Sequence, residues 1–132
     1  MSDGIVVDSS ALLAILFGEP DSETLLQSIL KARERHISAF SLLEAGTVAL
    51  YRKGQKGRAT FDALCQELAL EFAAFSRQHV ELAREAYDRF GKGRHPAALN
   101  LGDCCSYALA KATGLPLLCK GEDFPKTDIA LA

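Results

Sequence analysis

The stretch LGDCCSYALAKATGLPLLCKGEDF, residues 101–124, places acidic residues at the edges of apolar elements. Asp103 stands at the start of an apolar run with helical character. A strand-like run over 116–119 follows, and Glu122 and Asp123 come directly after it. Desolvation makes a carboxylate costly beside an apolar element, so these positions call for a chemical explanation.

Outward from this stretch, short apolar runs alternate with amphipathic runs along the whole chain. We expect strands over 4–7, 36–40 and 116–119, with 128–131 as a further candidate. We expect helices over 9–17, 21–35, 41–53, 59–72, 77–91 and 102–114. Such alternation is typical of a mostly parallel sheet flanked by helices. We therefore predict a three-layer α/β fold, built as one domain over residues 1–132.

The composition favours a globular protein without a membrane segment. Hydrophobic residues make up 48% of the chain, which is enough for a substantial core. No apolar run approaches the roughly 18 residues of a membrane-spanning helix. No positively charged segment precedes the first apolar run, so we expect no signal peptide, no membrane partner and a cytoplasmic location.

The cysteines are expected to be reduced and mostly buried. Cys65, Cys104, Cys105 and Cys119 include no C-x-x-C pair, and two adjacent cysteines on a helix point in different directions. This spacing is poor for zinc.

Two cationic segments stand out against a formal net charge of -2. RKGQKGR over 52–58 and RFGKGRH over 89–95 each contain several cations and no acid. Each follows an expected helix, so the cations could simply complement a helix dipole. They could equally hold the phosphates of a polyanion.

Four acids fall near one edge of the predicted sheet. Asp8 ends the first strand, Glu44 lies in the first turn of the helix after the second strand, and Asp103 opens the helix before the third. Asp123 follows the third strand. Sites in open parallel sheets form beyond the carboxyl ends of the strands. Segments far apart in sequence are therefore expected to direct these carboxylates to one place.

Each acid also has a local explanation. Asp8 could cap the following helix, and Glu44 could form a capping box with Ser41 in SLLE. Asp103 could favour the positive end of its helix, and Asp123 could be a turn residue. Four converging carboxylates without cations repel one another, and a divalent ion relieves that repulsion. Hard oxygen ligands suit Mg²⁺ or Mn²⁺, and such a site can promote hydrolysis of a phosphodiester.

Three blocks of the chain resemble PIN-domain ribonucleases, most closely the VapC toxins of bacterial toxin–antitoxin pairs. These blocks are IVVDSSALLAILFGEPDSE, SAFSLLEAGTVALYRK and HPAALNLGDCCSYALAKATGLPLLCKGEDFPKTDI, and the resemblance covers essentially the whole chain. On this resemblance, Asp8, Glu44, Asp103 and Asp123 match the four acids of the family, as catalytic residues and metal ligands.

The resemblance implies a metal-dependent endoribonuclease that uses Mg²⁺, with Mn²⁺ able to substitute. It further implies RNA as the substrate, inhibition by a cognate antitoxin protein, and a homodimer. Glu122 or Asp128 could join or replace Asp123 as the fourth acid. Ser9 matches a small polar residue that often supports the metal site, with helix capping as its alternative. Asn100 is expected to orient or cap its loop.

Other classes of function fit less well. A haloacid-dehalogenase-like or receiver-like phosphoryl-transfer domain would need a second Asp two residues after Asp8, where the chain has Ser10. A metal-independent ribonuclease would need paired histidines, but His36, His79 and His95 are scattered, with His79 expected on a solvated helix face. A PIN-like module that binds RNA or protein without cutting remains the alternative, and the four intact acids argue against it.

Overall fold

Four short parallel strands form the centre of the structure, a computed structural model that describes residues 3–132. Residues 1 and 2 of the expected domain lie outside this range. The strands are β1 (Gly4–Val7), β2 (Glu34–Ser38), β3 (Glu71–Ala73) and β4 (Leu117–Leu118). The helices are α1 (Ser9–Leu16), α2 (Ser22–Lys31), α3 (Ala39–Glu67), α4 (Arg77–Phe90), α5 (Leu101–Thr113) and the 3₁₀ helix η1 (Phe124–Lys126).

The strand order is β3-β2-β1-β4, and every pair is parallel. Val6 of β1 lies opposite His36 of β2 on one side and Leu117 of β4 on the other. Because the strands run in one direction, their carboxyl ends meet at a single edge of the sheet. The predicted parallel sheet is confirmed.

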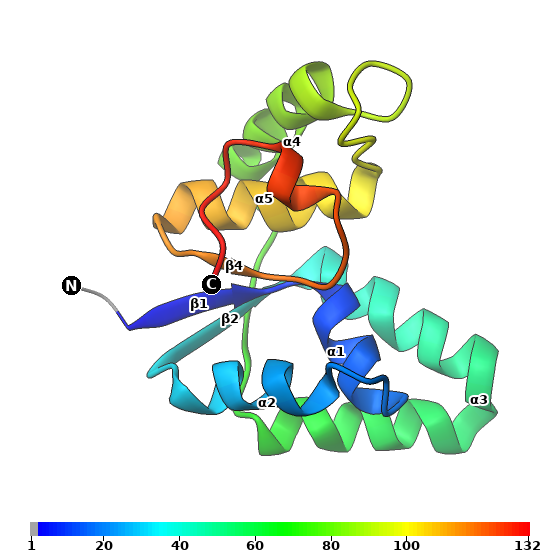
Figure 1. The fold of residues 1–132 in the computed structure, drawn as a ribbon. Coiled ribbons are helices and arrows are strands. Elements are labelled where there is room, and N and C mark those ends of the chain that lie inside the picture. Colours follow the sequence, from blue (N-terminus) through cyan, green and yellow to red (C-terminus); the bar gives the residue numbers. More distant parts are fainter. Residues whose placement is uncertain (1–2) are drawn as a thin grey trace.

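Helices cover both faces of the sheet (Figure 1). The helices α4 and α5 lie on one face, and α1, α2 and α3 lie on the other. Alternate residues of β1 point to opposite faces, as strand geometry requires. Val6 packs with Leu109 in the core on the α5 side, and Val7 packs with Leu12 in the core on the α1 side. The predicted three layers are thus confirmed.

The segment α3 consists of two helical arms on either side of a kink, in agreement with the break expected between helices over 41–53 and 59–72. Gly54 has a positive φ of 66°, which L side chains rarely adopt, and the two arms meet at this kink. Figure 1 shows the second arm running back beside α2. Most of the cationic segment 52–58 is therefore helical instead of forming a loop.

The boundaries around β2 and β3 differ from the sequence prediction. The Ser38 hydroxyl accepts a hydrogen bond from Phe40 N–H, so α3 begins at Ala39 and not at position 41. The second arm ends at Glu67, and Glu71–Ala73 pairs with β2 instead of continuing a helix to position 72. The periodicity of a segment does not report its pairing with a distant strand, so β3 could not be predicted from the local pattern.

Several side chains that the helical pattern of the sequence predicts to be buried are exposed. The segment 41–53 has few polar residues in its middle, which predicts burial, but Leu43 is 67% exposed and Tyr51 is 92% exposed. Leu30 and Phe72 are also exposed, and His79, expected in solvent, is buried.

The C-terminal segment and the surface differ in smaller ways. The candidate strand over 128–131 forms only a bridge between Leu117 and Leu131. Cys104 and Cys105 are buried, whereas Cys65 and Cys119 are only partly buried, and all four are free thiols.

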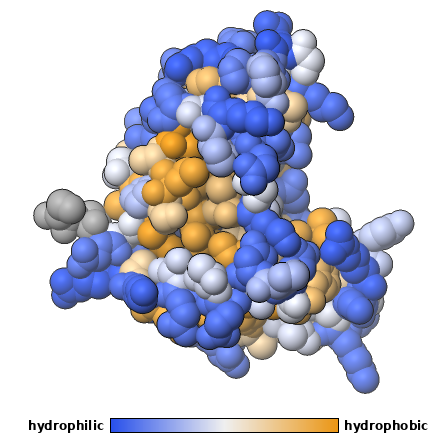
Figure 2. Space-filling model, in the orientation of Figure 1, coloured by the Kyte–Doolittle hydropathy of each residue, from blue (hydrophilic) through white to orange (hydrophobic). Residues whose placement is uncertain are grey.

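In Figure 2, apolar surface lies between two hydrophilic regions, over β4 and the C-terminal segment. None of the helices within residues 3–132 has both the length and the apolar character needed to cross a bilayer.

Candidate functional site

The carboxyl edge of the sheet brings together four acids from four segments. Asp8 follows β1, Glu44 lies in the second turn of α3, Asp103 lies in the first turn of α5, and Asp123 follows β4. Burial raises the pKa of Asp103 to about 6, and the charges of Asp8, Glu44 and Asp123 add to the increase. The backbone N–H of Asn100 partly opposes this shift. The mutual repulsion expected from the sequence is therefore present in the fold.

Both carboxylate oxygens of the buried Asp8 accept hydrogen bonds. The backbone N–H of Ser10 donates to Oδ2 at 3.0 Å, which confirms the predicted helix cap. The hydroxyl of Ser106 on α5 donates to Oδ1 at 2.5 Å. Ser41 on α3 lies 3.0 Å from the Ser106 hydroxyl, so three elements meet through polar side chains in the interior.

Glu44 is held by α1 and by the close approach of α5. The Ser9 hydroxyl donates to Oε1 at 2.9 Å. Burial raises the pKa of Glu44, the Ser9 hydrogen bond lowers it, and the charge of Asp8 raises it further. A Cβ atom at Gly102 would stand 2.5 Å from Oε2, so the carboxylate occupies space that only glycine leaves open. The predicted capping box with Ser41 is wrong, because Ser38 caps α3.

Asp103 belongs to a capping box that the sequence analysis did not identify. Its Oδ2 accepts from the backbone N–H of Asn100 at 3.0 Å, and the Asn100 side chain accepts from the backbone N–H of Asp103 at 2.8 Å. Asn100 therefore caps α5. The local and the functional explanation of Asp103 are compatible, since one carboxylate can cap a helix and still face the other acids.

The three candidates for the fourth acid differ in their surroundings. Asp123 is exposed and contributes to the raised pKa of Asp103, and Glu122 is also exposed. Asp128 instead accepts hydrogen bonds from Tyr107 at 2.5 Å and Lys111 at 3.2 Å. Partial burial opposes ionisation of Asp128, but these contacts and the charges of Lys111 and Arg89 hold its pKa below the usual range. Asp128 thus has partners of its own on α4 and α5.

The donor set fits a hard divalent cation by its chemistry. None of the ion pairs formed among residues 3–132 involves Asp8, Glu44, Asp103 or Asp123, so their charge is not balanced by Lys or Arg. In the same part of the chain, no three acidic, histidine or cysteine side chains come close enough to hold an ion. Metal binding would therefore bring other carboxylates closer to Asp8, whose two oxygens are already held by hydrogen bonds. Carboxylate oxygens are the ligands that Mg²⁺ and Mn²⁺ prefer.

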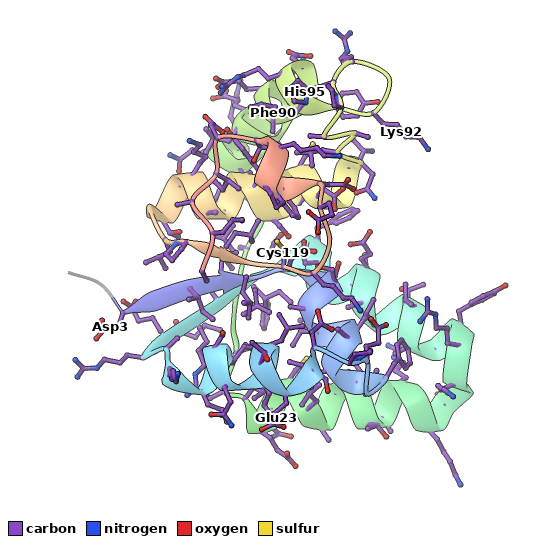
Figure 3. All side chains as sticks on the ribbon, viewed as in Figure 1. Asp3, Glu23, Phe90, Lys92, His95 and Cys119 are labelled. Atoms are coloured by element: carbon purple, nitrogen blue, oxygen red, sulfur yellow. The ribbon has the colours of Figure 1, made fainter. Side chains whose placement is uncertain are left out.

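Cys119 follows β4 near this edge of the sheet, and its side chain packs against the core on the α5 side (Figure 3). Burial raises the pKa of its thiol to about 12, with added contributions from the charges of Asp8 and Asp103. Burial likewise raises the pKa of Cys105 to about 11, with a contribution from Glu44. Both thiols are neutral at physiological pH and add no charge to the carboxylate site.

A cationic cleft lies between the end of α1 and the kink of α3. It has a volume of about 840 Å³ and is lined by Leu16, Phe17, Arg52, Lys53, Lys56, Gly57 and Thr60. The Arg52 guanidinium lies over the Phe17 ring, 4.8 Å from its centroid. Arg58 lines a different hollow with Asp62, so the cations of 52–58 do not act as one patch.

In the second cationic segment, two residues already have structural partners. Arg89 pairs with Asp128 at 3.3 Å, and the His95 ring packs edge-on against Phe90 with a centroid distance of 5.1 Å. Lys92 and Arg94 are exposed. Figure 3 shows the Lys92 side chain pointing outward from the loop after α4. Only part of 89–95 is therefore available for a polyanion.

The PIN domain family matches residues 5–130 of this chain, and the parallel sheet with acids at its carboxyl edge agrees with that match. The chain belongs to the PIN domain family. Among curated proteins, it is 45% identical over 126 residues to Ribonuclease VapC of Mycolicibacterium smegmatis, with 96% of this chain and 98% of the relative covered.

Two solved structures have the same fold. One is the Mycobacterium tuberculosis toxin VapC20, described as cleaving the sarcin-ricin loop, with a TM-score of 0.79 and 19% identity over 97% of this chain and 98% of that one. The other is VapBC2 from Rickettsia felis, bound to a DNA fragment from its promoter. It has a TM-score of 0.72 and 17% identity, and the match covers 98% of this chain and 97% of that one.

Proposed function

We propose that this chain, as a single domain over residues 1–132, is a metal-dependent endoribonuclease toxin acting in the cytoplasm. The observation that carries this proposal is the uncompensated charge of Asp8, Glu44, Asp103 and Asp123 around one edge of the sheet. The 45% identity to a VapC ribonuclease supports cleavage over the alternative of a PIN-like binding module that does not cut.

In this proposal, the four acids are the catalytic residues and hold Mg²⁺, for which Mn²⁺ can substitute. When bound, the ion lowers the pKa of an attacking water and stabilises charge on the phosphoryl oxygens. Asp8 enters this reaction with both oxygens already oriented by Ser10 and Ser106. Asp103 would hold the ion in its ionised form, which its pKa of about 6 allows at neutral pH. Attack in line with the 3′ oxygen leaves 5′-phosphate and 3′-hydroxyl ends.

The cationic cleft is proposed to hold the RNA backbone. Arg52, Lys53 and Lys56 line it together with Phe17, so phosphates meet cations and a base can stack on the exposed part of an aromatic ring. Figure 1 places the kink of α3 and the loop after α4 at opposite ends of the molecule, with the carboxyl edge of the sheet between them. An RNA strand that contacts both the kink of α3 and the loop after α4 would therefore pass over the four acids.

The antitoxin is proposed to reach the same edge. A short apolar segment could pack against Leu16 and Phe17 of the cationic cleft and against the first arm of α3. A cation from the antitoxin could then neutralise the carboxylates in place of the metal ion, because a guanidinium forms strong hydrogen bonds with carboxylates. The likeness to VapBC2 supports a protein partner of this kind.

A homodimer is proposed through the exposed apolar side chains at the start of α3, α4 and α5. Phe40, Phe75, Val80 and Leu101 line a hollow of about 390 Å³ there. Val80→Glu should shift the protein toward the monomer in light scattering after gel filtration, because it buries a charge in such an interface. Leu30→Glu, at an exposed position on α2, is the matched control. An unchanged mass for Val80→Glu would contradict this interface.

The activity is tested by mapping cleavage sites in cellular RNA with the purified protein and Mn²⁺. Asp8→Asn or Asp103→Asn should each lower the cleavage rate by at least about 100-fold, and EDTA should abolish cleavage. Asp62→Asn, which removes an exposed carboxylate from the second arm of α3, should leave the rate unchanged. A 2′,3′-cyclic phosphate product, or near wild-type activity in both site variants, would refute the mechanism.

A further inference from the structure

A chain of two buried hydroxyls connects α3 and α5 to Asp8. Ser41 and Ser106 are both 0% exposed, and Asp8 is 2% exposed. Ser106 Oγ lies 2.5 Å from Asp8 Oδ1 and 3.0 Å from Ser41 Oγ. We propose that Ser106, held by Ser41, is a positioning residue that orients Asp8 to bind a divalent cation. This proposal rests on the proposed function.

The direction of the two hydrogen bonds follows from the number of available protons. The Ser106 hydroxyl donates to Asp8 Oδ1, so its single proton is used in that contact. Ser41 must then be the donor in its contact with Ser106. Ser41 therefore satisfies the Ser106 oxygen and restricts the rotation of its hydroxyl, which keeps the Ser106 proton directed at Asp8.

The two donors to Asp8 come from independent parts of the chain. Ser10 belongs to α1 and binds Oδ2, whereas Ser106 belongs to α5 and binds Oδ1. With one donor on each oxygen, the plane of the carboxylate is fixed, and each oxygen retains a lone pair for a metal ion. Burial strengthens this restraint, because water cannot readily replace a missing donor.

Ser38 provides a control for Ser106, because it is a buried serine whose loss should affect stability but not the position of Asp8. Ser38 is 1% exposed, and its hydroxyl accepts from Phe40 N–H at the start of α3. Ser38→Ala removes a buried hydroxyl of the same kind, but that hydroxyl contacts backbone instead of a carboxylate. Its loss should lower the melting temperature through the helix cap and leave metal binding alone.

The test measures binding of Mn²⁺ alone to the purified protein by calorimetry, without RNA. Ser106→Ala should raise the Mn²⁺ dissociation constant by about 10- to 100-fold, since groups that orient metal ligands typically have effects of this size. Ser106→Cys, which retains a weak donor, should fall between wild type and Ser106→Ala. Ser38→Ala should stay within about twofold of wild type.

Ser41→Ala and the double variant test whether Ser41 acts on Asp8 through Ser106. Ser41→Ala should weaken Mn²⁺ binding less than Ser106→Ala does. Ser41→Ala combined with Ser106→Ala should match Ser106→Ala alone, because Ser41 acts only through Ser106. In RNA cleavage, the same variants should lower kcat and change KM by less than about twofold, since Asp8 orientation affects the reacting centre.

The result that overturns the positioning role is Mn²⁺ binding within about twofold of wild type for Ser106→Ala and Ser41→Ala. If Ser106→Ala fails to fold, Ser106→Cys and Ser41→Ala are judged by the same criterion. A wild type that binds Mn²⁺ and cleaves RNA, with variants that match it, overturns the positioning role alone. A wild type that neither binds Mn²⁺ nor cleaves RNA overturns both proposals.

Discussion

Glu44 and Gly102 lie so close together that a Cβ atom at position 102 would stand 2.5 Å from Glu44 Oε2. The first arm of α3 and the start of α5 therefore meet at a carboxylate, and the absence of a side chain at position 102 makes room for it. Gly102 therefore contributes to the carboxylate site by leaving room for Glu44, not by binding to it.

Gly102→Ala is expected to displace the Glu44 carboxylate and to lower RNA cleavage by about 10-fold or more. The control is Gly46→Ala in α3, where an added Cβ would lie at an ordinary 3.6 Å from Phe61. That variant should keep full activity and gain slightly in stability, since Ala favours helix over Gly by about 1 kcal/mol. Equal activity of both variants would show that Glu44 does not need its present position.

The stability of the metal-free protein is expected to rise as the pH falls through about 6. The folded pKa of Asp103 is raised to about 6, above its unfolded value of about 3.9. The folded protein therefore binds the proton more tightly, and this stabilisation is lost as the pH rises through the folded pKa. Melting in EDTA should show a higher transition at about pH 5 than at about pH 7.5, and Asp103→Asn should reduce the difference.

The stability of Asp103→Asn should also show whether Asp103 mainly repels the other acids or mainly caps α5. An amide oxygen can still accept from Asn100 N–H, so stability in EDTA should stay unchanged or rise slightly. Saturating Mn²⁺ at about 100 times its dissociation constant stabilises wild type by roughly 2.7 kcal/mol, and the variant should lose much of this gain. A loss of about 1 kcal/mol in EDTA, with no response to Mn²⁺ in either protein, would favour capping alone.

The cationic cleft predicts unequal roles for neighbouring cations. Replacing Arg52, Lys53 and Lys56 with Ala should weaken RNA binding and flatten its dependence on salt, because the variant neutralises fewer phosphates and so releases fewer counterions. Arg58→Ala should change the salt slope little, since Arg58 lines a different hollow. Binding titrations at several salt concentrations measure this slope. If the triple variant has the same salt dependence of RNA binding as wild type, these three cations do not contact the RNA phosphates.

Asp128 is expected to matter for stability more than for catalysis. Asp128→Asn weakens the contacts with Lys111 and Arg89 and keeps an acceptor for the Tyr107 hydroxyl. The melting temperature should fall, and RNA cleavage should remain close to wild type. Asp123→Asn should show the reverse pattern, with a strong loss of cleavage. A large loss of activity in Asp128→Asn, with stability unchanged, would restore Asp128 as a candidate ligand.

Local sequence patterns determined the class of fold and the positions of the acids. Helical periodicity and β-branched runs are short-range features, so the parallel sheet, its flanking helices and the edge where Asp8 and Asp123 lie could be predicted. The cap at Asp8 is equally local, since its donor is two residues away. The break between the helical runs over 41–53 and 59–72 was predicted, and the structure places it at Gly54.

Tertiary structure alone decided which side chains support those acids. Ser106 and Asp8 are separated by 98 positions, and Ser41 and Ser106 by 65, so no local pattern connects them. The same holds for the space at Gly102 and for the partners of Asp128. These contacts arise because α3 and α5 pack against the end of β1, and packing of distant elements depends on the whole fold rather than on neighbouring residues.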